Sequence, residues 1–98
     1  MIKLIMCLRR RSDLTREQFL DYWKNQHGPF FLKNAATMRA KKYVQSHTLD
    51  TLLNAGLRES RGMQPEYDGV AEVWFDSEQD LMEALGSPEG QQLGIALL

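Results

Sequence analysis

The spacing of hydrophobic residues along the chain predicts three β-strands, at Ile2–Leu8, residues 41–49 and Gly69–Phe75. The first is a run of mostly apolar residues, which favours a strand covered on both faces with Cys7 as a small core residue. The third is richest in strand-forming residues and places Glu72 and Trp74 on one face. A carboxylate in mid-strand must be wet or paired, so Glu72 can pair with a lysine or a histidine, and the alternative is an ion pair at a sheet surface or dimer interface. Trp74 is expected in the core or at an interface.

A first helix is indicated downstream of the first strand. Thr15 and Gln18 have the spacing of a capping box, in which each side chain bonds the backbone of the other residue. Phe19, Trp23 and His27 follow at intervals of four residues. This spacing places the three rings on one stripe of the helix, which is expected to face inward.

The first helix is expected to end near His27. Gly28 suits the left-handed position that follows many helices, and Pro29 has no backbone N–H with which to continue the ladder. A shorter helical stretch can follow over residues 30–38. Residues 50–68 are irregular apart from a short helical turn near residues 51–55, and a loop of this length is a candidate lid or partner contact.

Two helices are expected toward the C-terminus. Ser77 can cap the first of them, with Asp80 three residues later, and Gly86 ends it. Ser87 and Pro88 are typical of a new helix start, with serine at the cap and proline in the first turn.

The order strand, helix, strand, strand, helix is that of an α+β fold, the ferredoxin-like split βαβ with an antiparallel sheet. The final strand of that fold has no counterpart before Leu98. Either the natural protein continues beyond this sequence or the sheet is closed in another way. Without that strand, the first strand is expected to form an edge of the sheet.

Length and charge narrow the class of protein. Ninety-eight residues predict one domain, 1–98, and 43% hydrophobic with 26% charged residues is typical of a globular protein. The net charge of −1 gives no reason to expect nucleic acid or a membrane surface as partner. The basic run at residues 9–11 is interpreted as a solvated loop, with an anion or partner contact as the alternative. The single cysteine and the charge order of the N-terminus favour a cytoplasmic location.

Two segments together resemble the EthD family, whose members are small proteins of the dimeric α+β barrel superfamily. They are Tyr22-Trp23 with His27-Gly28-Pro29, and Tyr43-Val44-Gln45-Ser46-His47. The strand Gly69–Phe75 and the helix start Ser87-Pro88-Glu89-Gly90 also look like the family's. The resemblance implies a homodimer in which two ferredoxin-like subunits pack sheet against sheet. It also implies a pocket in each subunit between the sheet and the helices, where relatives catalyse several unrelated reactions.

His27 and His47 are the candidate catalytic residues. Imidazole titrates near neutral pH and can act as a general acid or base, and a helix C-terminus at His27 would favour its protonated form. Alternatively, His27 closes the helix end by donating to a carbonyl, and His47 meets water near a strand end. The candidate substrate-binding residues are Tyr22, Trp23, Tyr43 and Gln45, although aromatic residues in such a pattern are more often core than ligand-binding.

The function expected from these residues is the binding of a small, largely apolar aromatic or cyclic metabolite. The first hypothesis is an enzyme with no metal or organic cofactor that uses histidine acid-base chemistry for dehydration, isomerisation or oxygenation. Two histidines without further ligands at suitable spacing fall short of the ligand set of zinc, and no glycine-rich phosphate loop is present. The alternative is a non-catalytic metabolite-binding or accessory protein of a degradation pathway. A structural dimer without a ligand is the third reading.

Overall fold

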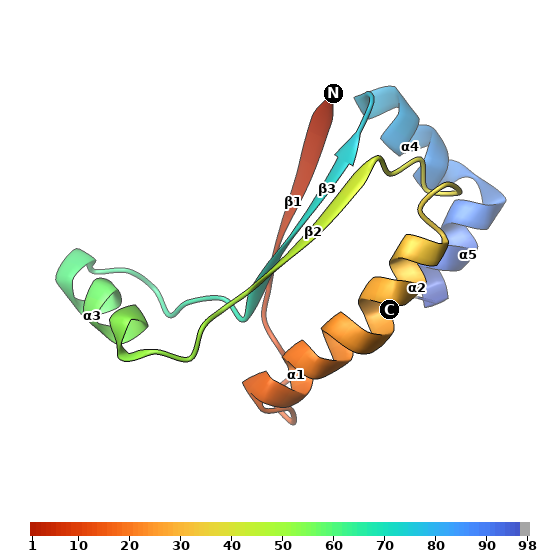
Figure 1. Cartoon of the computed structure of the whole chain (residues 1–98). Helices are drawn as coiled ribbons and strands as arrows, with labels where there is room; N and C mark the ends of the chain where they lie inside the picture. Colours follow the sequence, from red (N-terminus) through yellow and green to blue (C-terminus); the bar gives the residue numbers. More distant parts are fainter. Residues whose placement is uncertain (97–98) are drawn as a thin grey trace.

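The computed structural model describes the backbone of residues 1–96 and the side chains of residues 1–92. Three antiparallel strands form one sheet in the order β1-β3-β2 (Figure 1). The strands are β1 (Ile2–Leu8), β2 (Lys42–His47) and β3 (Gly69–Phe75). The helices are α1 (Arg16–Tyr22), the π-helix η1 (Trp23–His27), α2 (Gly28–Lys33), α3 (Leu52–Arg61), α4 (Glu78–Gly86) and α5 (Pro88–Ala96). The architecture is the ferredoxin-like α+β fold that the sequence predicts, and within the described residues β1 is an edge strand.

The alternation of β3 determines which face of the sheet carries the core. Its odd-numbered residues are buried and its even-numbered residues are half-buried. The buried face packs on helices, and Phe31 of α2 joins Val73 and Phe75 in the hydrophobic core. In the register, Leu4 of β1 and Tyr43 of β2 flank Val73 on this same face. The prediction that Glu72 and Trp74 share one face of β3 is therefore confirmed.

The opposite face of the sheet is not covered by the helices of the described chain. On this face Ile5 is 53% exposed and Cys7 is exposed. The prediction of a first strand covered on both faces, with Cys7 in a core, is wrong for the single chain, because helices pack on one face only. Glu72 pairs with Lys3 at 3.3 Å, and Trp74 lies between the amino groups of Lys3 and Lys42.

The helix that begins at Thr15 continues past the predicted stop. Its capping box forms as predicted, with the backbone N–H groups of Gln18 and Thr15 each donating to the other residue's side chain. At His27, however, the chain remains helical and runs on into α2. Gly28 has φ −58° and ψ −52°, so it is an ordinary right-handed helical residue rather than a left-handed cap.

The π-helix explains how a proline is accommodated. The N–H of Gly28 donates to the carbonyl of Trp23, five residues earlier, which widens the helix by one residue. Pro29 then falls in the first turn of α2, where a backbone N–H is not required. Gly28 is needed for close packing, because a Cβ there would lie 2.9 Å from Nε2 of Gln45.

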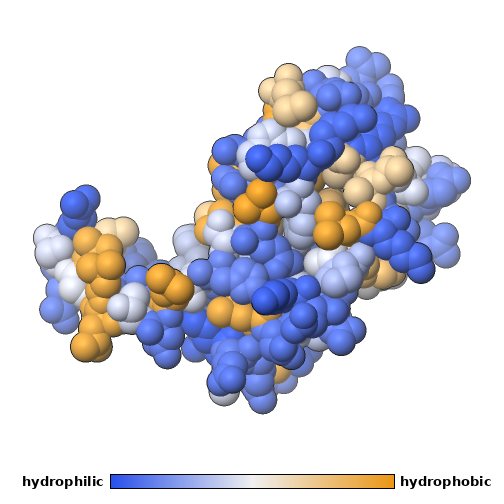
Figure 2. All heavy atoms as spheres, viewed as in Figure 1, coloured by the Kyte–Doolittle hydropathy of each residue, from blue (hydrophilic) through white to orange (hydrophobic). Residues whose placement is uncertain are grey.

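Residues 50–68 contain more order than the sequence predicts. Thr51 caps α3, and its side chain accepts from the N–H of Leu53. The helix runs to Arg61 and ends at Gly62, which has φ 61°. It stands apart from the other helices at the far end of the strands (Figure 1), and Figure 2 shows hydrophobic surface on this part of the molecule. Leu52 is 91% exposed there.

Asp68 anchors the loops that precede β3 and follow β1. It is buried, and its carboxylate accepts from the backbone N–H of Arg10 at 2.8 Å and from the guanidinium groups of Arg10 and Arg16. Burial alone would raise the pKa of Asp68, but these donors outweigh it and hold the pKa below its usual value. The basic run is therefore partly structural, since Arg10 binds an anionic side chain of its own chain.

Replacing Gly69 by alanine is expected to destabilise the fold by about 2 kcal/mol. Its Cβ would overlap the ring of Trp23, which is 3% exposed and packs directly on this backbone. Gly56 is the matched control, because a Cβ there meets no atom within 4 Å, and alanine in mid-helix is expected to stabilise α3 slightly. Urea denaturation measures both changes. Equal stability of the Gly69→Ala variant and the wild type would contradict this packing.

Candidate functional site

The consecutive helical segments α1, η1 and α2 (residues 16–33) form one rod, which we call the helical rod. An apolar cavity of about 410 Å³ lies between the helical rod and the helix-facing side of the sheet. This volume is in the range of small-molecule sites. Polar atoms contribute little to its walls, so it favours an apolar occupant. We call it the His27 cavity. Its lining residues are Met6, Leu8, Phe19, Tyr22, Trp23, His27, Phe31, Tyr43, Ala71 and Val73.

The helical rod supplies one wall as a stripe of rings. Phe19 stacks on Trp23 with ring centroids 5.8 Å apart, and His27 follows in the lining, as the four-residue spacing predicts. Because the helix continues through η1, the same spacing extends the stripe to Phe31. Phe31 in turn stacks on Tyr43 of β2 at 4.6 Å. The cavity is thus lined by aromatic groups from helix and strand.

The surroundings of His27 favour its neutral imidazole form. Burial lowers its pKa from the ordinary value of 6.5. The expectation that a helix C-terminus favours the protonated form is wrong, because the helix does not end at His27. Its Nδ1 is buried and has no hydrogen-bond partner among the described residues. The alternative interpretation requires His27 to donate to a carbonyl at a helix end. Its Nδ1 makes no such bond within the described residues.

A row of hydrogen bonds runs along the helix-facing side of β2. Nε2 of Gln45 lies 2.8 Å from the carbonyl oxygen of Trp23 and 2.9 Å from the hydroxyl oxygen of Tyr43. The other amide atom, Oε1, lies 2.8 Å from Nε2 of His47. The row links Tyr43, at the His27 cavity, to His47, which also stacks on the ring of Trp23 at 5.0 Å.

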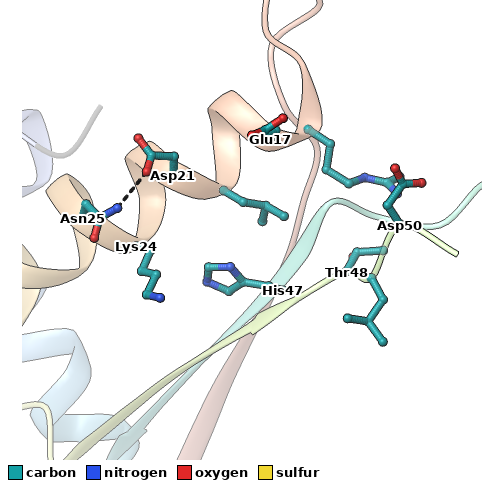
Figure 3. A pocket seen from close by; sticks show the side chains of 10 residues that line it. Glu17, Asp21, Lys24, Asn25, His47, Thr48 and Asp50 are labelled. Carbon is teal, nitrogen blue, oxygen red and sulfur yellow. Dashed lines mark hydrogen bonds between the residues drawn. The ribbon is translucent and has the colours of Figure 1, made fainter.

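His47 lines a different pocket. Figure 3 shows its imidazole projecting from the end of β2 toward the helix that carries Asp21 and Lys24. The groove has a volume of about 570 Å³, is open, and its walls include charged groups. We call it the His47 groove. It is bounded by Arg16, Glu17, Leu20, Asp21, Lys24, Asn25, His47, Thr48, Leu49 and Asp50.

The structure thus separates the two histidines predicted as one catalytic pair. Trp23 stacks on His47 and lines the His27 cavity, so its ring lies at the boundary of the two pockets. Tyr22, Trp23 and Tyr43 line the cavity with His27, whereas Gln45 lies behind them as a hydrogen-bonding partner.

Sequence reasoning did not name six of the lining residues as site residues, namely Phe19 and Phe31 of the helices and four residues of the sheet. These four, Met6, Leu8, Ala71 and Val73, form the floor of the cavity. The alternation of residues along β1 and β3 could have revealed them. In the register, even-numbered residues of β1 lie opposite odd-numbered residues of β3, on the same face of the sheet.

Two further kinds of feature are absent from the residues that the structure describes. No three or more His, Cys, Asp or Glu side chains in this part of the chain gather as a metal site. None of its helices has the length and apolarity required to cross a bilayer.

This fold and helix-walled cavity define a class of small α+β domain, and comparison with known proteins gives the family. Residues 11–96 match the family described as the EthD domain, so the chain belongs to the EthD family. The structure is similar to the crystal structure of an ethyl tert-butyl ether D (EthD) family protein from Bacillus halodurans, with a TM-score of 0.61 and 19% identity. That match covers 95% of this chain and 79% of the other, and it supports the fold. A search of curated proteins finds no match.

The lowered pKa of His27 predicts a distinctive pH dependence of stability. The unfolded chain takes up a proton near pH 6.5, whereas folded His27 takes it up only at lower pH. Unfolding therefore binds a proton in this window, and the free energy of unfolding should fall as pH drops below about 6.5, by at most about 1.4 kcal/mol per pH unit.

Urea denaturation between pH 7.5 and 5 measures this effect as a difference between the wild type and a His27→Phe variant. The variant is expected to lack the His27 contribution, so the free energy of unfolding of the wild type minus that of the variant should fall as the pH drops below about 6.5. Parallel curves over the whole range would show that His27 titrates alike in both states.

Proposed function

We propose that the His27 cavity binds a small, largely apolar aromatic or cyclic metabolite and that His27 acts on it as a general base. The observation that carries the proposal is an imidazole in the lining of an aromatic-walled cavity of ligand size, where burial lowers its pKa. A base must be unprotonated at the working pH, and the lowered pKa of His27 meets this condition. Nothing in this chemistry requires a metal or organic cofactor.

The proposal places the two histidines in different roles. His27 lines the cavity and can meet a ligand directly, whereas His47 contacts Gln45 and the ring of Trp23. We therefore assign proton transfer to His27 alone and a supporting position to His47. Tyr43 would supply a hydrogen bond to the ligand, and Tyr22, 62% exposed, would lie at the cavity edge.

The second candidate is a non-catalytic binding protein. The scarcity of polar groups on the cavity wall favours it, because most enzymes add further donors or acceptors around the reacting atoms. Both candidates share the ligand and the cavity, and they differ only in whether His27 moves a proton.

The exchange of α-hydrogens in 2-indanone separates the two candidates. In D₂O, a base at His27 would take a proton from the α-carbon, leave the electron pair as an enolate, exchange the proton for a deuteron from the solvent, and return that deuteron to the carbon. We expect the wild type to accelerate this exchange, and a His27→Gln variant to lose about 100-fold of the acceleration while still binding the ketone. Proton NMR follows both exchange and binding.

An Ala71→Leu variant serves as the control for location, because the larger side chain would rise from the buried cavity floor and fill it. It is expected to lose binding and exchange together. Binding without accelerated exchange in the wild type would support the non-catalytic candidate, and undiminished binding to Ala71→Leu would overturn the cavity itself.

We also propose that the chain forms a homodimer through the open face of the sheet. That face presents Ile5, Val44 and Val70 beside the polar cluster of Lys3 and Glu72, and no helix of the described residues covers it. Apolar residues in such a position gain stability when a second surface covers them. A second copy of the sheet offers both the apolar centre and the matching charges.

Light scattering after size exclusion measures the oligomeric state. The wild type is expected at twice the chain mass of 11.3 kDa, and a Val44→Asp variant at the single mass, because a charge would be buried without a partner. Met82→Asp is the control, since Met82 is 65% exposed on α4, on the helical side of the sheet. A monomeric wild type, or equal disruption by both variants, would contradict the proposal.

A further inference from the structure

Gln45 is held in one orientation by groups whose hydrogen-bonding roles are known. The carbonyl of Trp23 can only accept, so the amide atom 2.8 Å from it must be the donor Nε2. The same carbonyl also accepts from the N–H of Gly28, which uses its two lone pairs. Oε1 therefore faces His47, whose Nε2 must carry the proton of that bond.

This orientation determines what Tyr43 can do. The second hydrogen on Nε2 of Gln45 donates to the hydroxyl oxygen of Tyr43 at 2.9 Å. A phenolic hydroxyl that accepts in this way keeps its own hydrogen free to donate elsewhere. No described residue accepts that hydrogen, and Tyr43 lines the His27 cavity.

We propose that Gln45 sets Tyr43 as a hydrogen-bond donor to the occupant of the cavity, so that the site selects ligands carrying an acceptor oxygen on an apolar ring. A ketone, ether or similar oxygen can accept from the Tyr43 hydroxyl, whereas a ligand whose only polar group is a donor makes no hydrogen bond to Tyr43 held in this way. Gln45 is a positioning residue, because it lies behind the cavity lining and acts through Tyr43. The proposal rests on the proposed function, in that it needs a ligand in the His27 cavity.

The π-helix is part of this device. Nε2 of Gln45 on the neighbouring strand can reach the carbonyl of Trp23 only if no side chain of the helix lies in its way. Gly28 gives that access, because any Cβ at this position would crowd Nε2 of Gln45. The helical irregularity, the glycine and the glutamine thus act together on one hydroxyl group.

Three probes of nearly equal size test the selection. Indane has no polar group, 2-indanone adds an acceptor, and indole offers a single N–H donor. Isothermal titration or NMR titration gives their affinities for the wild type and for two variants, Tyr43→Phe and Gln45→Met. Circular dichroism and thermal unfolding establish that each variant is folded before its affinities are compared.

In the wild type, 2-indanone is expected to bind about fivefold more tightly than indane, as one neutral hydrogen bond allows. Tyr43→Phe is expected to remove this advantage and leave indane unchanged. Gln45→Met releases the lone pair of Tyr43, so the affinity for indole relative to indane is expected to rise by a similar factor. Any contact of indole with His27 is present in both proteins and cancels from this comparison.

The outcomes separate two failures. If indane binds but 2-indanone has no advantage, or if its advantage survives Tyr43→Phe, the donor role of Tyr43 is overturned. An unchanged relative affinity for indole in Gln45→Met would overturn the role of Gln45. If no probe binds to the wild type, the proposed function itself fails.

Discussion

The packing of Trp23 on the bare backbone of Gly69 is the contact on which the rest of the structure depends. Trp23 is 3% exposed, and its ring occupies the space in which a side chain on Gly69 would lie. This contact brings the helical rod against the central strand. Phe19 and His47 then stack on the same indole from two elements. The position of one ring therefore determines the spacing between helix and sheet, and with it the cavity.

Trp23 also separates two pockets that have different surroundings. The cavity that contains His27 is apolar and aromatic, whereas the groove that contains His47 is open and charged. A histidine in the first environment loses hydration and its pKa falls. The row through Gln45 is the polar connection between the two sides. Two histidines that look equivalent in the sequence thus acquire different chemical surroundings.

Much of the fold could be predicted because local rules and the global fold agree. The bounds of β1 and β3, the caps at Thr15 and Ser77, and the inward stripe of Phe19, Trp23 and His27 are confirmed. These features depend on periodicity and on capping side chains, which act over a few residues. The EthD resemblance is confirmed by the family match over residues 11–96.

The errors arose where tertiary contacts override local preference. Gly-Pro normally ends a helix, but here a π turn accepts the proline, and the glycine serves close packing against Gln45. Cys7 lies in an apolar run yet is exposed, because no helix of the described chain covers that face. The separation of His27 from His47 depends on where Trp23 packs, which no spacing in the sequence reveals.

A crystal structure of the protein grown with 2-indanone would test the central claim most directly. We expect electron density for the ketone between the helical rod and the sheet, with its ring against Trp23 and Phe31 and its oxygen within hydrogen-bond distance of the Tyr43 hydroxyl. Density for the ketone in the groove beside His47, or a His27 cavity that stays without ligand at saturating ketone, would show that the His27 cavity is not the ligand site.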